Sequence, residues 1–271
     1  MTVRLDNRSR ALRRMVLDGL KQARRGHLGA ALSLVEILRA LYDDVLRYRP
    51  DDPLWADRDR LILSKGHGCL ALYALLVDKG YFDRSELGGF CALDGTLGGH
   101  PERKKVPGVE ATTGSLGHGL SIGVGMALAA QLRQRDYRVF VVVGDGECNE
   151  GAVWEAALSA AKHGLNNLTV IIDYNKQQSY GSTTEVCDLE PFPEKWQSFG
   201  WDALSCDGHD VTALSQLLAG AVGERPRALI CHTVKGAGIA EAEHNPAWHH
   251  KNKISDEQLL ALYQELGDLH A

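Results

Sequence analysis

Two apolar runs, each followed at once by polar residues, constrain the fold of this chain more than any other feature. Residues 139–143 (VFVVV) lead into Gly144-Asp145-Gly146, and residues 168–172 (LTVII) lead into Asn175. The segment between them has the composition of a helix, so the pattern predicts a strand–helix–strand unit with parallel strands. Asp145 and Asn175, which follow the two strands, then lie at the carboxyl edge of the sheet, where open α/β sheets bind their ligands.

Asp145 and Asn175 carry oxygen atoms of the kind that a hard divalent cation takes beside a phosphate. A backbone carbonyl, phosphate oxygens and water would complete the six-coordinate shell that Mg²⁺ prefers. Gly146 lets a backbone N–H approach an anion with no side chain in the way, and the helix predicted from about Gly151 points its positive end there. Asp-Gly is also a common turn dipeptide, but the spacing to Asn175 favours a site for a metal and a diphosphate.

Predicted strands and helices alternate from about residue 60 onward. We expect strands at 61–63, 139–143, 168–172 and 228–234, helices at 7–24, 34–46, 69–79, 115–133, 211–222 and 256–266, and long loops at 88–114 and 177–193. Ser33 and Glu36 are expected to form a capping box at the second helix. This order predicts an α/β fold: a doubly wound, mostly parallel sheet with helices on both faces. With no internal repeat or linker, we expect a single domain over residues 1–271.

Composition excludes several classes of protein. The formal net charge of −5 argues against a nucleic-acid-binding surface, which favours a basic balance. No segment approaches the 18 or more apolar residues of a membrane span, and the first residues lack the apolar run of a signal peptide. The six cysteines have no metal-binding spacing, which is typical of reduced thiols in a cytoplasmic protein.

A glycine-rich segment and four histidines are further candidates for a binding site. Residues 114–119 (GSLGHG) run into a predicted helix but lack the Lys of a Walker A loop, so a ligand-binding loop and a structural turn both stay open. His27, His67, His100 and His249 each stand in a loop. A solvent-exposed role is the ordinary interpretation of any one, but four in comparable settings favour a pocket that binds hydroxyls and moves protons. No spacing typical of zinc ligands occurs.

Seven segments, in order and spacing, resemble the diphosphate-binding third of transketolase. They are GHLGA at 26–30, SKGHGC at 64–69, GHPE at 99–102, TTGSLGHG at 112–119, GDGECNEG at 144–151, DYNKQQ at 173–178, and KGAGI with AWHH within 235–250. The similarity covers nearly the whole chain. The sequence therefore resembles the N-terminal subunit of a split transketolase, with the thiamine-diphosphate-binding fold.

This resemblance implies a role for each matching residue. Asp145 and Asn175 would bind Mg²⁺ or Ca²⁺ through their side chains and Gln177 through its carbonyl, and the metal would hold thiamine diphosphate. Contacts to the cofactor would come from Gly114, Ser115, Leu116, Gly146 and His67. Asn175 would contact both the metal and the cofactor. His27, His100 and His249 would line the substrate channel. Glu150 and Glu155, five apart on a helix that could simply be solvated, match acids that connect paired active sites.

The implied activity is transfer of a two-carbon ketol unit from a ketose to an aldose or aldose phosphate. The Glu that activates the aminopyrimidine of the cofactor belongs to another domain and has no match here, so a separate subunit with the pyrimidine-binding and C-terminal domains is expected, in an α2β2 assembly. Leu28 and Ser115 replace prolines that are usual in the family, and His250 replaces a glycine. A subunit of a 2-oxo acid dehydrogenase or decarboxylase, and a non-catalytic cofactor-binding subunit, are the alternatives.

Overall fold

A computed structural model describes residues 3, 5–179, 181–220 and 223–267. Within them, five strands form one parallel sheet in the order β1-β2-β3-β5-β4. The strands are β1 (Arg60–Leu63), β2 (Val139–Gly144), β3 (Leu168–Tyr174), β4 (Asp202–Asp207) and β5 (Arg227–His232). Four of them correspond to the predicted strands. The sequence did not predict β4, because it is an edge strand whose side chains are exposed or half-buried.

Helices cover the sheet and its ends. They are α1 (Asn7–Ala23), α2 (Leu28–Leu32), α3 (Val35–Ala40), α4 (Cys69–Asp78), α5 (His118–Leu132), α6 (Gly151–Lys162), α7 (Thr183–Val186), α8 (Phe192–Ser198), α9 (Val211–Ala219) and α10 (Asp256–Glu265), with single turns η1 (Leu41–Val45), η2 (Gly66–Gly68), η3 (Arg84–Gly89), η4 (Gly146–Asn149) and η5 (Pro246–Trp248). Helix α5 begins three residues later than predicted. The expected loop 177–193 contains α7 and the start of α8. The predicted helix 211–222 ends at Ala219, and residues 221–222 lie outside the described part.

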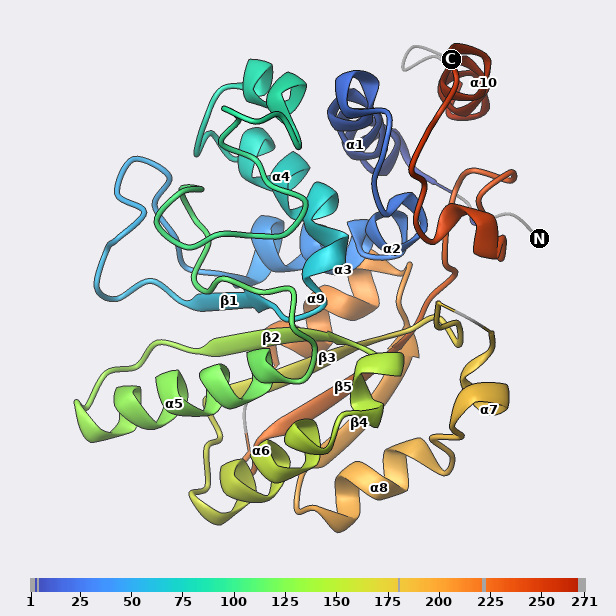
Figure 1. Cartoon of the computed structure of the whole chain (residues 1–271). Helices are drawn as coiled ribbons and strands as arrows, with labels where there is room; N and C mark the ends of the chain where they lie inside the picture. Colours follow the sequence, from blue (N-terminus) through green and yellow to red (C-terminus); the bar gives the residue numbers. More distant parts are fainter. Residues whose placement is uncertain (1–2, 4, 180, 221–222, 268–271) are drawn as a thin grey trace.

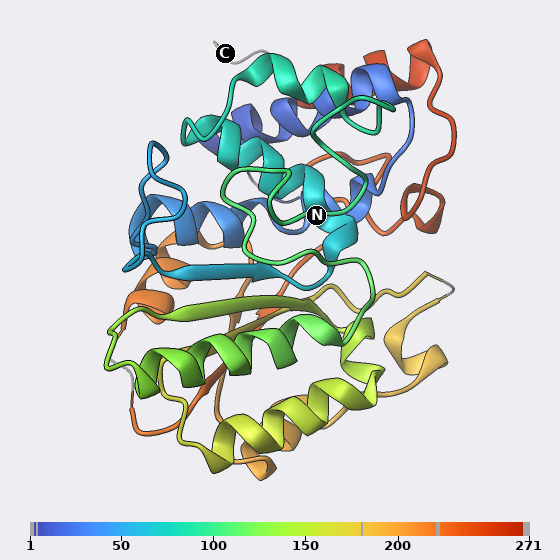
Figure 2. The same cartoon turned by 60° about the vertical axis from the view of Figure 1, so that its left-hand side comes forward.

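Alternate residues of the strands pack on opposite faces of the sheet. In β2, Phe140 and Val142 belong to the core beneath α1, α3, α4 and α9, whereas Val141 and Val143 belong to the core beneath α5, α6 and α8. Figures 1 and 2 show the sheet between these two helical layers. The predicted doubly wound fold is confirmed. No helix among the described residues is long and apolar enough to cross a membrane.

The predicted capping box at Ser33 is wrong. The helix expected at 34–46 is divided into α3 and the π-helical turn η1, and α2 precedes it. The Ser33 hydroxyl instead donates to the buried Asp173 carboxylate at 2.6 Å, and Glu36 forms a buried ion pair with Arg13. Two half-buried serines do form capping boxes, at Ser182 and Ser255. The local sequence pattern does not distinguish Ser33 from a serine that caps a helix, because the partners of Ser33 and Glu36 come from distant segments.

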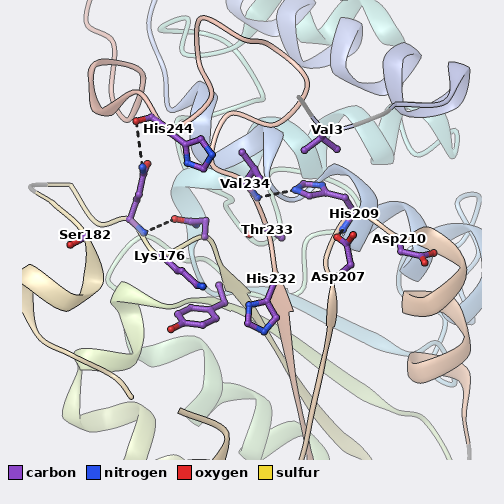
Figure 3. Close-up of a pocket in the computed structure, with 13 residues that line it drawn as sticks. Val3, Lys176, Ser182, Asp207, His209, Asp210, His232, Thr233, Val234 and His244 are labelled. Atoms are coloured by element: carbon purple, nitrogen blue, oxygen red, sulfur yellow. Dashed lines mark hydrogen bonds between the residues drawn. The ribbon is translucent and has the colours of Figure 1, made fainter. Parts of the chain in front are cut away.

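The Arg13–Glu36 pair extends to the loop after β5. Arg13, which is 0% exposed, donates to the two Glu36 oxygens at 2.6 and 2.9 Å and to the carbonyl of Ala237 at 2.8 Å. His209 Nε2 accepts from the Val234 N–H at 2.9 Å (Figure 3), so a neutral ring carries its proton on Nδ1 and donates it to Glu36 at 2.8 Å. These contacts fix the loop on both sides of Lys235.

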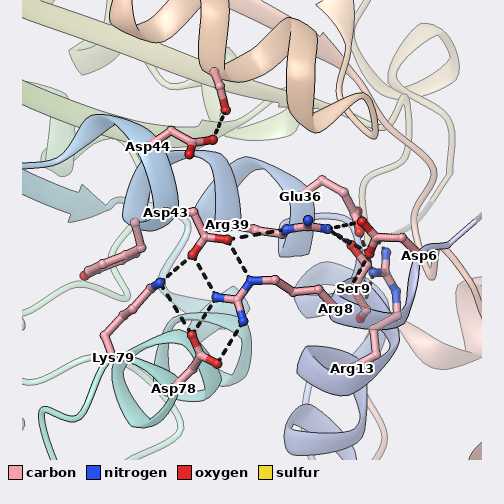
Figure 4. Close-up of polar contacts among 12 residues, drawn as sticks. Asp6, Arg8, Ser9, Arg13, Glu36, Arg39, Asp43, Asp44, Asp78 and Lys79 are labelled. Carbon is pink, nitrogen blue, oxygen red and sulfur yellow. Dashed lines mark hydrogen bonds and ion pairs between the residues drawn. The ribbon is translucent and has the colours of Figure 1, made fainter. Parts of the chain in front are cut away.

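A more exposed ion network stands beside this pair (Figure 4). Arg8 of α1 binds Asp43 at 2.7 Å and Asp78 at 2.8 Å, and the Lys79 ammonium contacts the same Asp43. The network joins α1, η1 and the end of α4. It therefore stabilises the helical layer from which several loops of the site begin.

Candidate functional site

Four loops meet at the carboxyl edge of the sheet, after β1, β2, β3 and β5. They enclose a cavity of about 160 Å³. Its lining includes eight of the predicted residues: His67, Leu116, Asp145, Gly146, Glu150, Asn175, Gln177 and His249. A larger cleft of about 900 Å³ (Figure 3) lies next to it and shares Asn175 and Gln177. We centre the site on the smaller cavity, because that is where the carboxylate, the amide and the imidazoles converge.

The predicted metal ligands lie together. Asp145 is 2% exposed and accepts from the backbone N–H of Gly146 at 2.7 Å and of Lys176 at 2.5 Å. Burial, and then the neighbouring Asp173, raise the pKa of Asp145 to about 7. The Asn175 side-chain oxygen accepts from the Gln177 N–H at 3.1 Å. A cation bound here would compensate a carboxylate that the protein leaves poorly stabilised in its charged form.

The rest of the donor set also fits a cation with a diphosphate. Among the described residues, no group of three or more His, Cys, Asp or Glu side chains could hold a metal, so one carboxylate would act with amide and carbonyl oxygens. Three buried atoms that line the cavity have no hydrogen-bond partner within this part of the chain: Gln177 Oε1, Gln178 Nε2 and His249 Nδ1. Buried polar groups are normally paired. Their convergence indicates that a polar ligand completes the site.

Two buried lysines also line the cavity, and the sequence analysis gave neither a role. Lys65, 1% exposed, forms an ion pair with Asp173, whose carboxylate also accepts from Ser33 and Thr233. Burial opposes the charged form of Asp173, but Lys65 and these hydrogen bonds lower the pKa of the carboxyl below its ordinary value. The Lys235 ammonium donates to the carbonyl of Gln177 at 3.1 Å. Two cations beside one cavity suit an anionic ligand.

Burial lowers the pKa of Lys235 to about 8, with Lys65 the next cause. A diphosphate would reverse this effect, since it would place negative charge next to both ammonium groups. Both lysines stand inside segments quoted above, SKGHGC and KGAGI. That they face one cavity depends on the pairing of strands far apart in the sequence.

Glu147 is a third residue that the sequence analysis passed over. It is 2% exposed and accepts from the Ser64 hydroxyl, from the Gly117 N–H at 2.9 Å and from the Gly144 N–H at 3.1 Å. One carboxylate therefore ties the end of β1, the start of α5 and the end of β2. Gly119 must lack a side chain for the same contact to form, because a Cβ there would lie 2.2 Å from the Ser64 hydroxyl.

The predicted histidines form a cluster around His27. Its ring lies 5.5 Å from that of His67, 5.7 Å from that of His249 and 6.1 Å from that of His100. The Ser179 hydroxyl is 2.9 Å from His249 Nε2. His67 and His249 face the cavity, whereas His100 is exposed on the outer side.

Burial keeps these imidazoles neutral. It lowers the pKa of His27 to about 4, with His250 the next cause, and that of His249 to about 3, with Lys235 the next cause. Burial lowers the pKa of His67 well below its ordinary value, and it also lowers that of His100. At neutral pH each ring can therefore both donate and accept a hydrogen bond.

Comparison with known proteins agrees with this geometry. The family model described as transketolase, thiamine diphosphate binding domain, matches residues 6–269. The chain belongs to the transketolase family. It is 42% identical to one of the subunits of apulose-4-phosphate transketolase from Actinobacillus succinogenes, over 97% of this chain and 96% of that protein. It is 39% identical, with the same coverage, to a 6-deoxy-6-sulfo-D-fructose transketolase subunit of a Clostridium species.

Solved transketolases share the fold. A variant from Pichia stipitis has a TM-score of 0.89 and 32% identity over 98% of this chain, and the enzyme from Campylobacter jejuni has a TM-score of 0.89 and 30% identity over 98%. This chain spans 41% and 43% of their lengths, respectively. It thus matches a part of those longer chains, but nearly all of the two relatives from Actinobacillus and Clostridium.

The remaining residues that the transketolase resemblance suggested lie at different distances from the cavity. Glu150 precedes α6 and lines the cavity. Glu155 is exposed on α6 and does not line the cavity. Gly114 packs against His100, since a Cβ on Gly114 would be 3.3 Å from the His100 ring. Ser115 is exposed and is not part of the lining. A cofactor role for Glu155 and Ser115 stays a prediction.

Proposed function

We propose that this chain is the diphosphate-binding subunit of a two-component transketolase. It would act with a separate pyrimidine-domain subunit, in a cytoplasmic α2β2 assembly, to transfer a two-carbon ketol unit from a ketose to an aldose or aldose phosphate. The observation that carries the proposal is the cavity in which Asp145 and Asn175 meet two buried lysines and a cluster of neutral histidines. Relatives of similar length named as transketolase subunits support it. Residues 1–271 would form a single domain.

The residues of the cavity would divide the binding of thiamine diphosphate and its metal. Asp145, Asn175 and the Gln177 carbonyl would hold Mg²⁺ or Ca²⁺, with the carboxylate ionised once the cation is present. Gly146 and the positive end of α6 would face the diphosphate, and the Gly146 N–H would then leave its bond to the Asp145 carboxylate. Lys65, Lys235, His67, Gly114, Ser115 and Leu116 would complete the anion site. When bound, this cofactor supplies the carbanion chemistry of ketol transfer.

The histidines would act on the sugar. His27 and His249 are neutral and their rings lie 5.7 Å apart, so each can hydrogen-bond a sugar hydroxyl and orient its proton for transfer. His249 would use Nδ1, because its Nε2 lies 2.9 Å from the Ser179 hydroxyl. His100 would do the same from the outer side. A 2-oxo acid has few hydroxyls to engage such a cluster, and this favours a sugar substrate over the dehydrogenase or decarboxylase alternative. A scaffold role would leave the three unpartnered polar atoms described above, and the imidazoles, without purpose.

The experiment is to purify this chain alone and together with the pyrimidine-domain subunit of the same genome. Both samples are assayed for ketol transfer with thiamine diphosphate, Mg²⁺ and a panel of ketose donors. We expect activity only in the pair, because the group that activates the aminopyrimidine has no match in these residues. The pair with Asp145→Ala serves as the inactive control. Robust activity of the lone chain, or none in an assembled pair that binds the cofactor, would overturn the proposal.

A further inference from the structure

We infer that His250 is a specificity-determining residue, which contacts the part of the sugar beyond the two carbons that are transferred. This inference rests on the proposed function. Its ring lies 4.5 Å from that of His27, closer than the rings of His67, His100 or His249.

The backbone places His250 firmly. On one side of it, Trp248 is 1% exposed and anchors the turn η5 in the core. On the other side, Lys251 pairs with Gly26 through two backbone hydrogen bonds of 2.9 and 3.0 Å. Since Gly26 precedes His27, the same bridge holds both imidazoles next to each other. The contact of the two rings is therefore a feature of the fold.

The cluster has an inner and an outer side. His67 and His249 line the cavity assigned to the diphosphate. His100 and His250 are exposed, and neither lines that cavity. His27 lies between the two sides. A sugar whose reacting carbon is near His27 and the cavity would extend its remaining carbons outward, past His250.

The ring nitrogens of His250 are available to a substrate. No hydrogen bond or ion pair to its side chain is found within residues 3, 5–179, 181–220 and 223–267. The imidazoles of His27 and His249 lie near it, and the described residues contain no group of three or more His, Cys, Asp or Glu side chains that could hold a metal. An imidazole in this setting suits a sugar hydroxyl, to which it can donate or from which it can accept.

The test compares two donors in the assembled pair. One is the ketose phosphate that the wild type uses best among fructose 6-phosphate, xylulose 5-phosphate and sedoheptulose 7-phosphate. The other is hydroxypyruvate, which donates the same two-carbon unit with release of CO₂ and has no hydroxyl beyond it. For His250→Gly and His250→Phe, we expect kcat/KM to fall about three- to tenfold with the ketose phosphate, the effect of losing one neutral hydrogen bond. With hydroxypyruvate it should stay within about twofold.

Three controls separate this role from a structural one. His250→Asn keeps a hydrogen-bonding side chain and should restore part of the loss. His163→Asn changes an exposed imidazole at the end of α6 and should alter neither donor. Cofactor affinity should be unchanged in the His250 variants. Equal losses with both donors, or no loss with either, would overturn the inference while leaving the proposed function standing, whereas a wild-type pair inactive with every donor would overturn both.

Discussion

Replacing Glu36 by Gln should destabilise the fold strongly, because it leaves the buried Arg13 guanidinium without a counter-charge. Arg13 is 0% exposed and bonds to both Glu36 oxygens. A guanidinium cannot shed its proton to relieve the loss. Removing one partner of a buried pair costs about 3–5 kcal/mol. For a chain of 271 residues the entropy of unfolding is about 0.6 kcal/mol/K, so Tm should fall by about 5–9 °C.

The assay is thermal unfolding followed by circular dichroism, with the free energy of unfolding taken from urea titration. The matched control is Asp57→Asn, which breaks the Arg135–Asp57 pair, whose side chains are 50% and 40% exposed. Such a surface pair contributes about 1 kcal/mol or less, or about 2 °C. A Glu36→Gln shift no larger than that of the control would refute the reasoning.

The pH dependence of the same pair gives an independent check. Burial opposes ionisation of Glu36, but Arg13 and the hydrogen bond to His209 hold the pKa of Glu36 well below its ordinary value. A carboxyl with a lowered pKa stabilises the folded state above its unfolded pKa, which is about 4.3. The difference in stability between wild type and Glu36→Gln should therefore be full at pH 6 to 7 (on the order of the loss given above) and shrink as the pH falls below about 4.

Three further predictions concern the site. Asp145→Ala in the assembled enzyme should abolish Mg²⁺-dependent binding of thiamine diphosphate, measured by calorimetry, and unchanged affinity would remove Asp145 from the metal site. His27→Ala and His249→Ala should lower turnover by about 10²- to 10⁴-fold at saturating cofactor, and near-wild-type turnover would make both structural. Gly119→Ala should destabilise the chain by about 1–3 kcal/mol, because the new Cβ would meet Ser64. Gly125→Ala, with open space around it in the same helix, should instead stabilise it by about 0.5–1 kcal/mol, and equal effects would contradict the packing argument.

The sequence predicted those features that depend on local pattern. The runs before Asp145 and Asn175 gave the two central strands, because a strand buried on both faces is apolar throughout. Four histidines in comparable loop positions indicated a histidine-lined pocket, and the rings of His27 and His249 do lie 5.7 Å apart. Asp145 and Asn175, the predicted metal ligands, both line one cavity, as expected from the carboxyl edge of a parallel sheet.

Features that depend on distant partners were not predictable in this way. Ser33 and Glu36 have the spacing of a capping box, but Ser33 bonds to Asp173, 140 residues away. The role of Lys65 depends on the same Asp173. Strand β4 lacks a buried face, so its composition gives no strand signal. In each case the decisive neighbour comes from a strand or helix elsewhere in the fold.

The Glu147 carboxylate has a consequence for how this site can move. It bonds to the hydroxyl after β1 and to the backbone at the start of α5 and the end of β2. A displacement of any one of these segments breaks a contact shared with the other two. The three segments should therefore move together as a single body when any one of them is displaced.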